Sequence, residues 1–205
     1  MRLRLLFCIG GKEMKLTILG TGNAVDEGEK IQLRDGREVV LREAEPEDAE
    51  SMIAYLRQTA AETHFMVRLP EEVDFTLEEE ERILRNIRKS DKDLMLAAFD
   101  GDRVVGNVGV HIFHDCTKVR HRSSLGIAII EEYCSSGLGT ILMERGIDFA
   151  KKAGFEQLEL GVFADNDRAL RLYKKMGFEE IGRIPRAFRL PDGSYIDEIT
   201  MVKML

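Results

Sequence analysis

The segment from Glu131 to Phe155 restricts the fold more than any other part of the sequence. It follows SSLGIAII (Ser123 to Ile130), an apolar run without charge that is typical of a buried β-strand. After the short sequence CSSGLG it continues as an amphipathic helix that ends at Gly154. A strand that enters a helix through such a turn leaves unpaired backbone N–H groups and the positive end of the helix dipole there. The pattern therefore predicts a phosphate-binding turn.

Two other glycine motifs compete with this interpretation, and neither fits. A Walker loop requires GK followed by Ser or Thr, whereas Gly139 is followed by Thr140 and Ile141. A Rossmann fingerprint requires Gly or Ala where Leu142 stands, and it follows the first strand of a βαβ unit. The sequence therefore disfavours nucleoside-triphosphate hydrolysis and dinucleotide binding.

The residues before this turn predict a strand, two helices and a hairpin. Glu38 to Ala44 is typical of a strand, and Pro46 with the acids after it begins a helix. Thr76 to Ser90 has a Thr cap, an acidic first turn and apolar residues at helical spacing. Asp100-Gly101 lies between two apolar runs, so we expect a tight antiparallel hairpin there.

The residues after the turn predict a further strand, a helix and a closing hairpin. The strand is Gln157 to Phe163, and Asp165 or Asn166 can cap the helix that follows. Gly177 ends that helix before another strand. A turn at Pro191-Asp192-Gly193 then separates two alternating runs that we expect to pair.

Composition narrows the class of partner. A chain of 205 residues with 44% hydrophobic residues can bury the core of one domain. A net charge of −7 argues against nucleic acid and anionic membrane as partners and favours a cationic substrate. Cys8, Cys116 and Cys134 lack CxxC spacing, which predicts neither disulfides nor a zinc site. The apolar run near Met1 is too short for a signal peptide or a membrane span, so we expect a cytoplasmic protein. The sequence leaves open whether the protein forms a homodimer.

Four motifs then occur in an order that resembles the GNAT N-acetyltransferase superfamily. They are LGIAII, the turn CSSGLG (Cys134 to Gly139, called the glycine turn below), LELGVFADN and RALRLYKKMGFEEIG. The resemblance covers roughly Glu38 to Met204 and is specific from about Leu125 to Gly182. It implies a single α/β domain with a mixed, mostly antiparallel central sheet that is flanked by helices. It also implies that Leu125 to Ile130 splays away from Gln157 to Phe163 and leaves room for pantetheine.

The resemblance implies a domain organisation as well. We expect residues 1–35 to be an appendage or an extra strand, and residues 36–205 to form the N-acetyltransferase domain. Met14 to Ala24 also resembles the first strand and turn of metallo-β-lactamase-fold hydrolases. That family requires an HxHxDH cluster, which His64, His111, His114 and His121 never form. We therefore expect no metal.

The family's binding residues can be carried over by position. In this family the strand backbone holds the pantetheine arm, the turn binds the pyrophosphate through its amides, and an Asn contacts pantetheine. The implied acetyl-CoA-binding residues are Ile127, Ala128, Ile129, Cys134, Ser135, Ser136, Gly137, Leu138, Gly139, Thr140, Asn166 and Tyr173. One departure is Cys134, because the family usually has Gln or Arg there, so a side-chain contribution to phosphate binding is missing.

The resemblance implies acetyl transfer from acetyl-CoA, as cosubstrate, to a primary amine by direct attack. Tyr173 stands at the position of the family's general acid for the CoA thiolate, and the Ile129 amide can stabilise the oxyanion. The acceptor is a small-molecule amine or a peptide N-terminus. The sequence leaves the general base open among Glu131, Glu132, Glu159, His111 and His121, or a base that acts through ordered water. The alternative function is a non-catalytic acyl-CoA-binding regulatory module of the same fold, with Tyr173 as a core aromatic.

Overall fold

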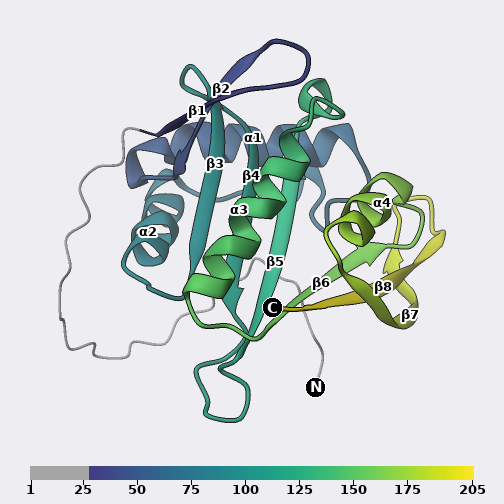
Figure 1. Ribbon diagram of the computed structural model, residues 1–205. Coiled ribbons are helices and arrows are strands. Elements are labelled where there is room, and N and C mark those ends of the chain that lie inside the picture. Colours follow the sequence, from purple (N-terminus) through teal and green to yellow (C-terminus); the bar gives the residue numbers. More distant parts are fainter. Residues whose placement is uncertain (1–27) are drawn as a thin grey trace.

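The computed structural model describes residues 28–205, so the expectations for residues 1–27, including the metallo-β-lactamase-like segment, lie outside it. Eight strands form one open sheet in the order β1-β2-β3-β4-β5-β6-β8-β7 (Figure 1). The strands are β1 Glu29–Gln32, β2 Glu38–Glu43, β3 Leu94–Asp100, β4 Arg103–Ile112, β5 Arg122–Ile129, β6 Gln157–Phe163, β7 Glu179–Arg189 and β8 Tyr195–Met204. The helices are α1 Ala49–Glu62, α2 Leu77–Arg88, α3 Leu138–Lys152 and α4 Asp167–Lys175.

The elements follow the local signals in the sequence. Thr76 caps α2 through a hydrogen bond from the Glu79 N–H at 3.2 Å, and the Glu79 carboxylate accepts from the Thr76 N–H in return. Gly101, at a φ of +59°, forms the turn of the β3–β4 hairpin, and Gly193, at +85°, lies in the β7–β8 turn. The expected helix after the glycine turn begins at Leu138 and is preceded by a short 3-10 helix, Glu131–Tyr133.

One pair of neighbouring strands differs from the rest. All other pairs are antiparallel, whereas β5 and β6 are parallel and pair only from Arg122 and Gln157 to Ser124 and Glu159. Beyond those three residue pairs the two strands diverge, as Figure 1 shows. The mixed, mostly antiparallel sheet and its splayed central strands are confirmed. We call the space between Leu125–Ile129 and Leu160–Phe163 the strand gap.

The helices cover the two faces of the sheet. In Figure 1, α3 crosses in front of the sheet and α1 lies behind it. The α3 face carries Val108 of β4 and Leu125 of β5, both of which contact α3 at Gly146. On the α1 face the Tyr55 hydroxyl donates to Asn107 Oδ1 at 2.8 Å. No helix within residues 28–205 is both long and apolar enough to cross a membrane.

The first described strand extends the sheet at one edge. β1 pairs with β2 from Glu29 and Leu41 to Gln32 and Glu38. In the turn between these strands, the Arg34 N–H donates a hydrogen bond to the Ser136 carbonyl oxygen at 3.0 Å. This contact joins the start of the described chain to the glycine turn more than 100 residues later. The division of the chain at residue 35 stays a prediction.

Gly146 sets how closely α3 approaches the sheet. A Cβ at this position would lie 2.9 Å from Val108 Cγ2 and 3.2 Å from Leu125 Cδ1. We expect Gly146→Val to lower the free energy of unfolding by about 1–3 kcal/mol, because the core has no room for the side chain. Urea unfolding measures the change. Gly182→Val is the control, since no atom lies within 4 Å of a Cβ there, and an equal loss in both variants would contradict the packing account.

Candidate active site

The glycine turn has backbone N–H groups without a hydrogen-bond acceptor among the described residues. Ser135 and Gly137 both have left-handed backbones, with φ of 66° and 97°. Within residues 28–205 no group accepts a hydrogen bond from the amides of Ser135, Ser136 or Gly137. Alternating left- and right-handed residues turn successive N–H groups toward one point, which makes a concave anion site. The turn also lies at the N-terminus of α3, where the helix dipole is positive.

The side chain of Ser136 holds the turn in this shape. Its hydroxyl donates to the Tyr133 carbonyl oxygen at 2.7 Å and accepts from the Leu138 N–H at 3.3 Å. Ser136 is only 4% exposed, so its side chain faces inward and only its backbone is offered to a ligand. The Cys134 sulfur lies 3.9 Å from the Ile129 carbonyl oxygen, which orients this side chain toward β5.

An arginine from a distant segment lies beside the turn. A Cβ at Gly137 would be 3.2 Å from Nε of Arg34, so the exposed Arg34 side chain lies against this glycine. Arg34 has no ion pair within the described residues. Arg37, in contrast, forms an ion pair with Asp35 at 2.6 Å, and its guanidinium lies 3.8 Å from the centroid of the Tyr133 ring. The sequence analysis missed Arg34, because no local pattern links it to residue 137.

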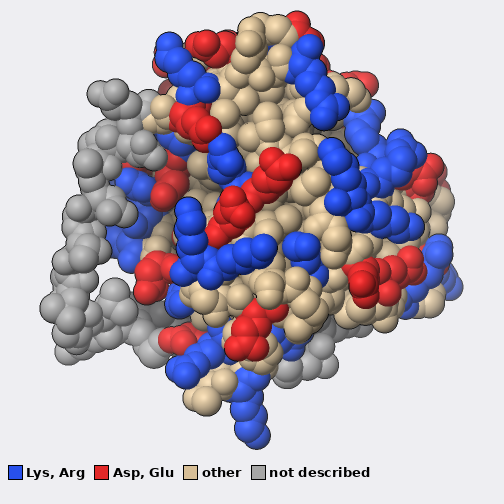
Figure 2. All heavy atoms as spheres, in the orientation of Figure 1, with Lys and Arg blue, Asp and Glu red and all other residues tan. Residues whose placement is uncertain are grey.

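Further basic side chains surround the same end of the molecule. Figure 2 shows Lys and Arg side chains gathered over α4. One of them, Lys175, donates to the Thr140 hydroxyl at 3.4 Å and so connects α4 to the first turn of α3. The chain carries a net charge of −7, yet this local surface is positive and suits a polyanion.

The edge of β5 offers backbone groups to the strand gap. The Ile130 N–H donates to the Val105 carbonyl oxygen of β4 at 3.2 Å. Because successive N–H groups of a strand point to opposite edges, the Ile129 N–H points to the gap, and the Ile127 N–H does the same. Ile127, Ala128 and Ile129 are all partly exposed. The N–H groups of Ile127 and Ile129 are therefore available to a ligand in the strand gap, and the binding role expected for these residues stays a prediction.

α4 brings Asn166 and Tyr173 to the α3 face of the sheet. The Asn166 side chain caps the helix, because its Oδ1 accepts from the Ala169 N–H at 3.1 Å. Tyr173 is 7% exposed, and its ring centroid lies 6.1 Å from that of Phe178. Burial raises the pKa of the Tyr173 phenol to about 12. The phenol therefore stays protonated at neutral pH.

Three candidate bases already have other partners. Glu159 is held by Arg122, whose Nη2 lies 2.7 Å from Oε2, and also by the Gln157 amide at 3.0 Å. Glu132 forms an ion pair with Arg103 at 3.1 Å. His111 lies 3.2 Å from an Asp93 carboxylate oxygen.

The other two lie at the ends of β5. Glu131 is exposed just beyond the strand, and its N–H donates to a Glu62 carboxylate oxygen at 2.7 Å. His121 precedes Arg122, where β5 and β6 are still paired, so it lies at the closed end of the strand gap.

An aromatic cluster on the α1 face was not expected from the sequence. Phe163 of β6 stacks on Phe188 of β7, with ring centroids 3.6 Å apart and planes 7° apart. Phe65, which follows α1, contacts Phe163 edge-on. His64 lies against the same ring, and its Nε2 is 2.8 Å from Asp165 Oδ2. These side chains form an apolar wall beside the end of β6.

The charged residues of the closing hairpin mostly bind one another. Arg183 forms an ion pair with Asp197 at 2.8 Å, and the Arg186 N–H donates to the same carboxylate at 2.8 Å. The Arg186 and Arg189 guanidinium groups lie 4.0 and 6.0 Å from the Tyr195 ring centroid. These contacts join the two strands of the closing hairpin to one another.

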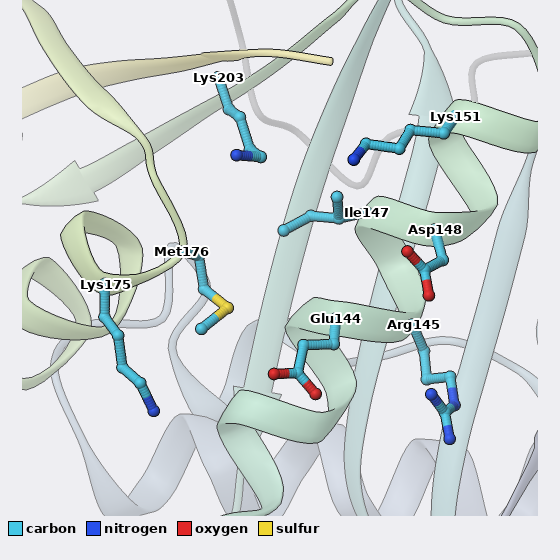
Figure 3. Close-up of a pocket in the computed structure, with 8 residues that line it drawn as sticks. All are labelled: Glu144, Arg145, Ile147, Asp148, Lys151, Lys175, Met176 and Lys203. Atoms are coloured by element: carbon cyan, nitrogen blue, oxygen red, sulfur yellow. The ribbon is translucent and has the colours of Figure 1, made fainter.

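A shallow groove runs between α3 and the α4–β8 region (Figure 3). Figure 3 shows Glu144, Asp148, Lys151, Lys175 and Lys203 around it, with Ile147 and Met176 on its walls. Acidic and basic side chains alternate along the groove, which gives no single charge for a ligand to match. Within residues 28–205 no group of three or more His, Cys, Asp or Glu side chains can hold a metal ion.

An open sheet with splayed parallel strands and an amide-lined turn at a helix N-terminus defines a protein that binds an extended, anionic cosubstrate. The sequence matches the model of the acetyltransferase (GNAT) family over residues 48–178. The chain belongs to this family, and it is an N-acetyltransferase.

Individual relatives agree with this assignment. The L-amino acid N-acetyltransferase AaaT of Escherichia coli is 28% identical over 171 residues, which cover 82% of this chain and 98% of the relative. A GNAT-family acetyltransferase from Streptococcus pneumoniae superposes with a TM-score of 0.78 at 33% identity and covers 82% of this chain and 99% of its own. A ribosomal-protein-alanine N-acetyltransferase from Brucella melitensis superposes with a TM-score of 0.71 at 25% identity and covers 81% and 99%.

The two neighbouring serines of the turn give a direct test of its construction. Ser136→Ala removes both hydrogen bonds of the hydroxyl, so we expect the free energy of unfolding to fall by about 1–2 kcal/mol. Ser135→Ala is the control, because the Ser135 side chain has no hydrogen bond within the described residues. Ala and Ser are also equally strained by the left-handed backbone at residue 135. Thermal unfolding measures both variants. Equal melting temperatures would contradict the role given to Ser136.

Proposed function

We propose that the protein transfers an acetyl group from acetyl-CoA to a primary amine by direct attack in the strand gap. The strand gap carries this proposal, because an extended cosubstrate can complete the sheet edge of β5 only where β6 has moved away. The glycine turn lies at the end of the same strand, so a pyrophosphate bound there places the rest of the molecule along Ile127–Ile129.

Each part of the turn has a role in binding acetyl-CoA. The amides of Ser135 to Gly137, together with that of Gly139 in the first turn of α3, donate to the pyrophosphate. Leu138 and Thr140 position these groups, and Asn166 offers its amide nitrogen to the pantetheine arm. Arg34 supplies the side-chain contribution to phosphate binding that the family usually makes with Gln or Arg at residue 134, where this chain has Cys134. A guanidinium matches phosphate geometry better than a thiol does, and Arg34 has no competing ion pair among the described residues.

Acyl transfer requires two charges to be stabilised. The Ile129 N–H donates to the oxyanion that forms when the amine attacks the thioester carbonyl. Tyr173 donates to the sulfur as the C–S bond breaks. With the pKa of Tyr173 at about 12, complete proton transfer to a free thiolate (pKa ~8.5) costs about 5 kcal/mol. The phenol therefore acts chiefly as a hydrogen-bond donor to the leaving thiolate.

The acceptor approaches from the α1 face, opposite the nucleotide. We propose a small-molecule amine or a peptide N-terminus as acceptor, since one similar protein is named for L-amino acids and another for a ribosomal-protein alanine. The apolar wall of Phe163, Phe188 and Phe65 favours an acceptor with a hydrophobic group near the amine. A cytoplasmic location stays a prediction. Whether the protein forms a homodimer stays open.

Turnover distinguishes this function from acyl-CoA binding without catalysis. The purified protein is incubated with acetyl-CoA and, separately, each of the twenty L-amino acids and a short peptide with a free N-terminal alanine. Release of free thiol that depends on the acceptor is expected for at least one of them. Calorimetric binding of acetyl-CoA without thiol release would favour the regulatory module, and absence of binding would contradict both functions.

Replacing Arg34 tests the phosphate end of the site. We expect Arg34→Ala to raise the KM for acetyl-CoA about tenfold or more with little change in kcat, because a charge-assisted hydrogen bond is worth about 1.5–3 kcal/mol. The KM should also depend less on ionic strength than in the wild type. Lys30→Ala removes one positive charge from the neighbouring β1 strand and serves as control. An equal rise in KM in both variants would point to general electrostatics only.

Replacing Tyr173 tests the chemical step. We expect Tyr173→Phe to lower kcat about 100-fold while the KM for acetyl-CoA stays within about twofold, because the ring packing is kept and only the donor is lost. The raised pKa also predicts that wild-type activity shows no loss from Tyr173 ionisation below about pH 11. Tyr195→Phe, on an exposed tyrosine, is the matched control. An unchanged kcat in Tyr173→Phe would exclude the role.

A further inference from the structure

The carboxylate of Glu198 lies on top of a glycine of the neighbouring strand. Glu198 is in β8, directly opposite Phe163 of β6. A Cβ at Gly161 would overlap Oε1 of Glu198 and would lie 2.9 Å from its Cδ. The side chain therefore lies over β6 at the one residue of that strand that has no side chain. No other glycine within residues 28–205 has a carboxylate in its place in this way.

This position puts the carboxylate at the border of the strand gap. β6 has β8 on one side and the gap on the other, so a group from β8 that lies over Gly161 of β6 lies beside the gap. Glu198 shares a sheet face with Gly161 and Phe163, because directly opposite residues point the same way. That face carries His64 and Phe65 after α1. The carboxylate thus lies on the acceptor side, whereas Tyr173 approaches from the α3 side.

Glu198 has no partner of its own among the described residues. Within residues 28–205 no side chain or N–H donates to this carboxylate, and no cation pairs with it. It is half-buried, and this burial raises the pKa of the Glu198 carboxyl above its ordinary value. A carboxylate that is partly desolvated and unpaired is costly for a fold, and such groups concentrate at functional sites.

The charged groups around it are paired with one another. On β6, Glu159 is bound to Arg122 of β5. After β6, Asp165 pairs with His64 from the segment that follows α1, and on β8 and β7 Asp197 pairs with Arg183. Each of these carboxylates therefore has a side-chain partner, while Glu198 has none among the described residues and is left to bind a cation from outside.

We propose that Glu198 is the general base that takes a proton from the acceptor ammonium. The proposal rests on the function proposed above and names the group that the candidate bases from the sequence did not supply. An ammonium is the cation that the unpaired carboxylate can bind, and the same contact orients the nitrogen toward the gap.

The proton balance of the reaction is complete with this group. The ammonium gives one proton to Glu198, and the nitrogen lone pair then forms the C–N bond with the thioester carbonyl carbon. The C–S bond breaks, and its electron pair stays on sulfur beside the Tyr173 hydroxyl. The second proton lost by nitrogen ends on the CoA thiol. Glu198 returns its proton to water before the next turnover.

Glu198→Gln keeps the shape and removes the base. With acetyl-CoA and the amino acid or alanine peptide of the panel that gives the highest turnover, we expect kcat/KM at pH 7 to fall about 100-fold or more. The wild type should lose activity as acid protonates Glu198, with a midpoint above the ordinary carboxyl pKa because burial raises it. The variant should lack this midpoint. Its kcat/KM should instead rise about tenfold per pH unit, because the fraction of acceptor that is a neutral amine rises by that factor. A constant ratio of the two activities across pH would overturn the proposal.

A relocated carboxylate is the second test. Glu198→Ala combined with Gly161→Glu places a carboxylate on β6 itself, where Glu198 now lies, and Gly161 has no left-handed backbone that would oppose a side chain. We expect this pair to recover at least tenfold of the kcat/KM lost in Glu198→Ala alone, with the acid-side midpoint restored. Absence of recovery, in a protein that still binds acetyl-CoA by calorimetry, would contradict the proposal.

The two proposals fail in different ways. A wild type that neither binds acetyl-CoA nor releases thiol would overturn the proposed function. Normal turnover and an unchanged pH profile in Glu198→Gln would overturn only the role of Glu198. A carboxyl group with a raised pKa destabilises the folded protein when it is charged. We therefore expect Glu198→Gln to maintain or raise the melting temperature at pH 7, so a loss of activity in this variant does not come from misfolding.

Discussion

The early end of the hydrogen bonding between β5 and β6 is the constraint on which the rest of the structure depends. Three residue pairs hold these strands together, and the sheet then opens for the remaining length of both. A β-strand edge with unpaired N–H groups is normally a liability, and proteins cover it or use it to bind a ligand. Here the opening lies between Ile127–Ile129 and Gly161–Phe163, in the middle of the sheet.

In the function proposed above, the strand gap divides the reaction between the two faces of the sheet. The glycine turn, Arg34, Lys175 and Tyr173 belong to the face that carries α3 and α4, and we propose that they serve the cosubstrate. Glu198 and the aromatic wall belong to the face that carries α1, and we propose that they serve the acceptor. In this proposal, donor and acceptor approach from opposite sides and meet only in the gap, with the proton donor near the sulfur and the base near the nitrogen.

The sequence predicted what local patterns encode. Hydrophobic periodicity and turn residues located the strands and helices, and the glycine turn with its helix was recognisable because it is continuous in the chain. Asn166 and Tyr173 were carried over by position from the family resemblance, and their roles stay predictions. The divergence of β5 from β6 was implied by the family resemblance, because no residue in either strand predicts where their pairing ends.

The sequence does not predict residues whose position depends on the register of distant strands. Arg34 reaches the glycine turn because β1 and β2 are added to the sheet edge, and Glu198 reaches the strand gap because β8 pairs with β6 in one register. A shift of one residue in that register would turn Glu198 to the other face. The absence of a side chain at Gly161 is equally necessary, and in the sequence it looked like an ordinary strand glycine.

Hydrogen exchange of individual backbone amides with and without acetyl-CoA tests the central claim most directly. The account predicts that acetyl-CoA slows exchange at Ile127 and Ile129 in the gap and at Ser135, Ser136, Gly137 and Gly139 in the turn, while the β7–β8 hairpin is unaffected. Protection confined to other parts of the chain, such as the groove between α3 and α4, would show that acetyl-CoA binds elsewhere and would contradict the account.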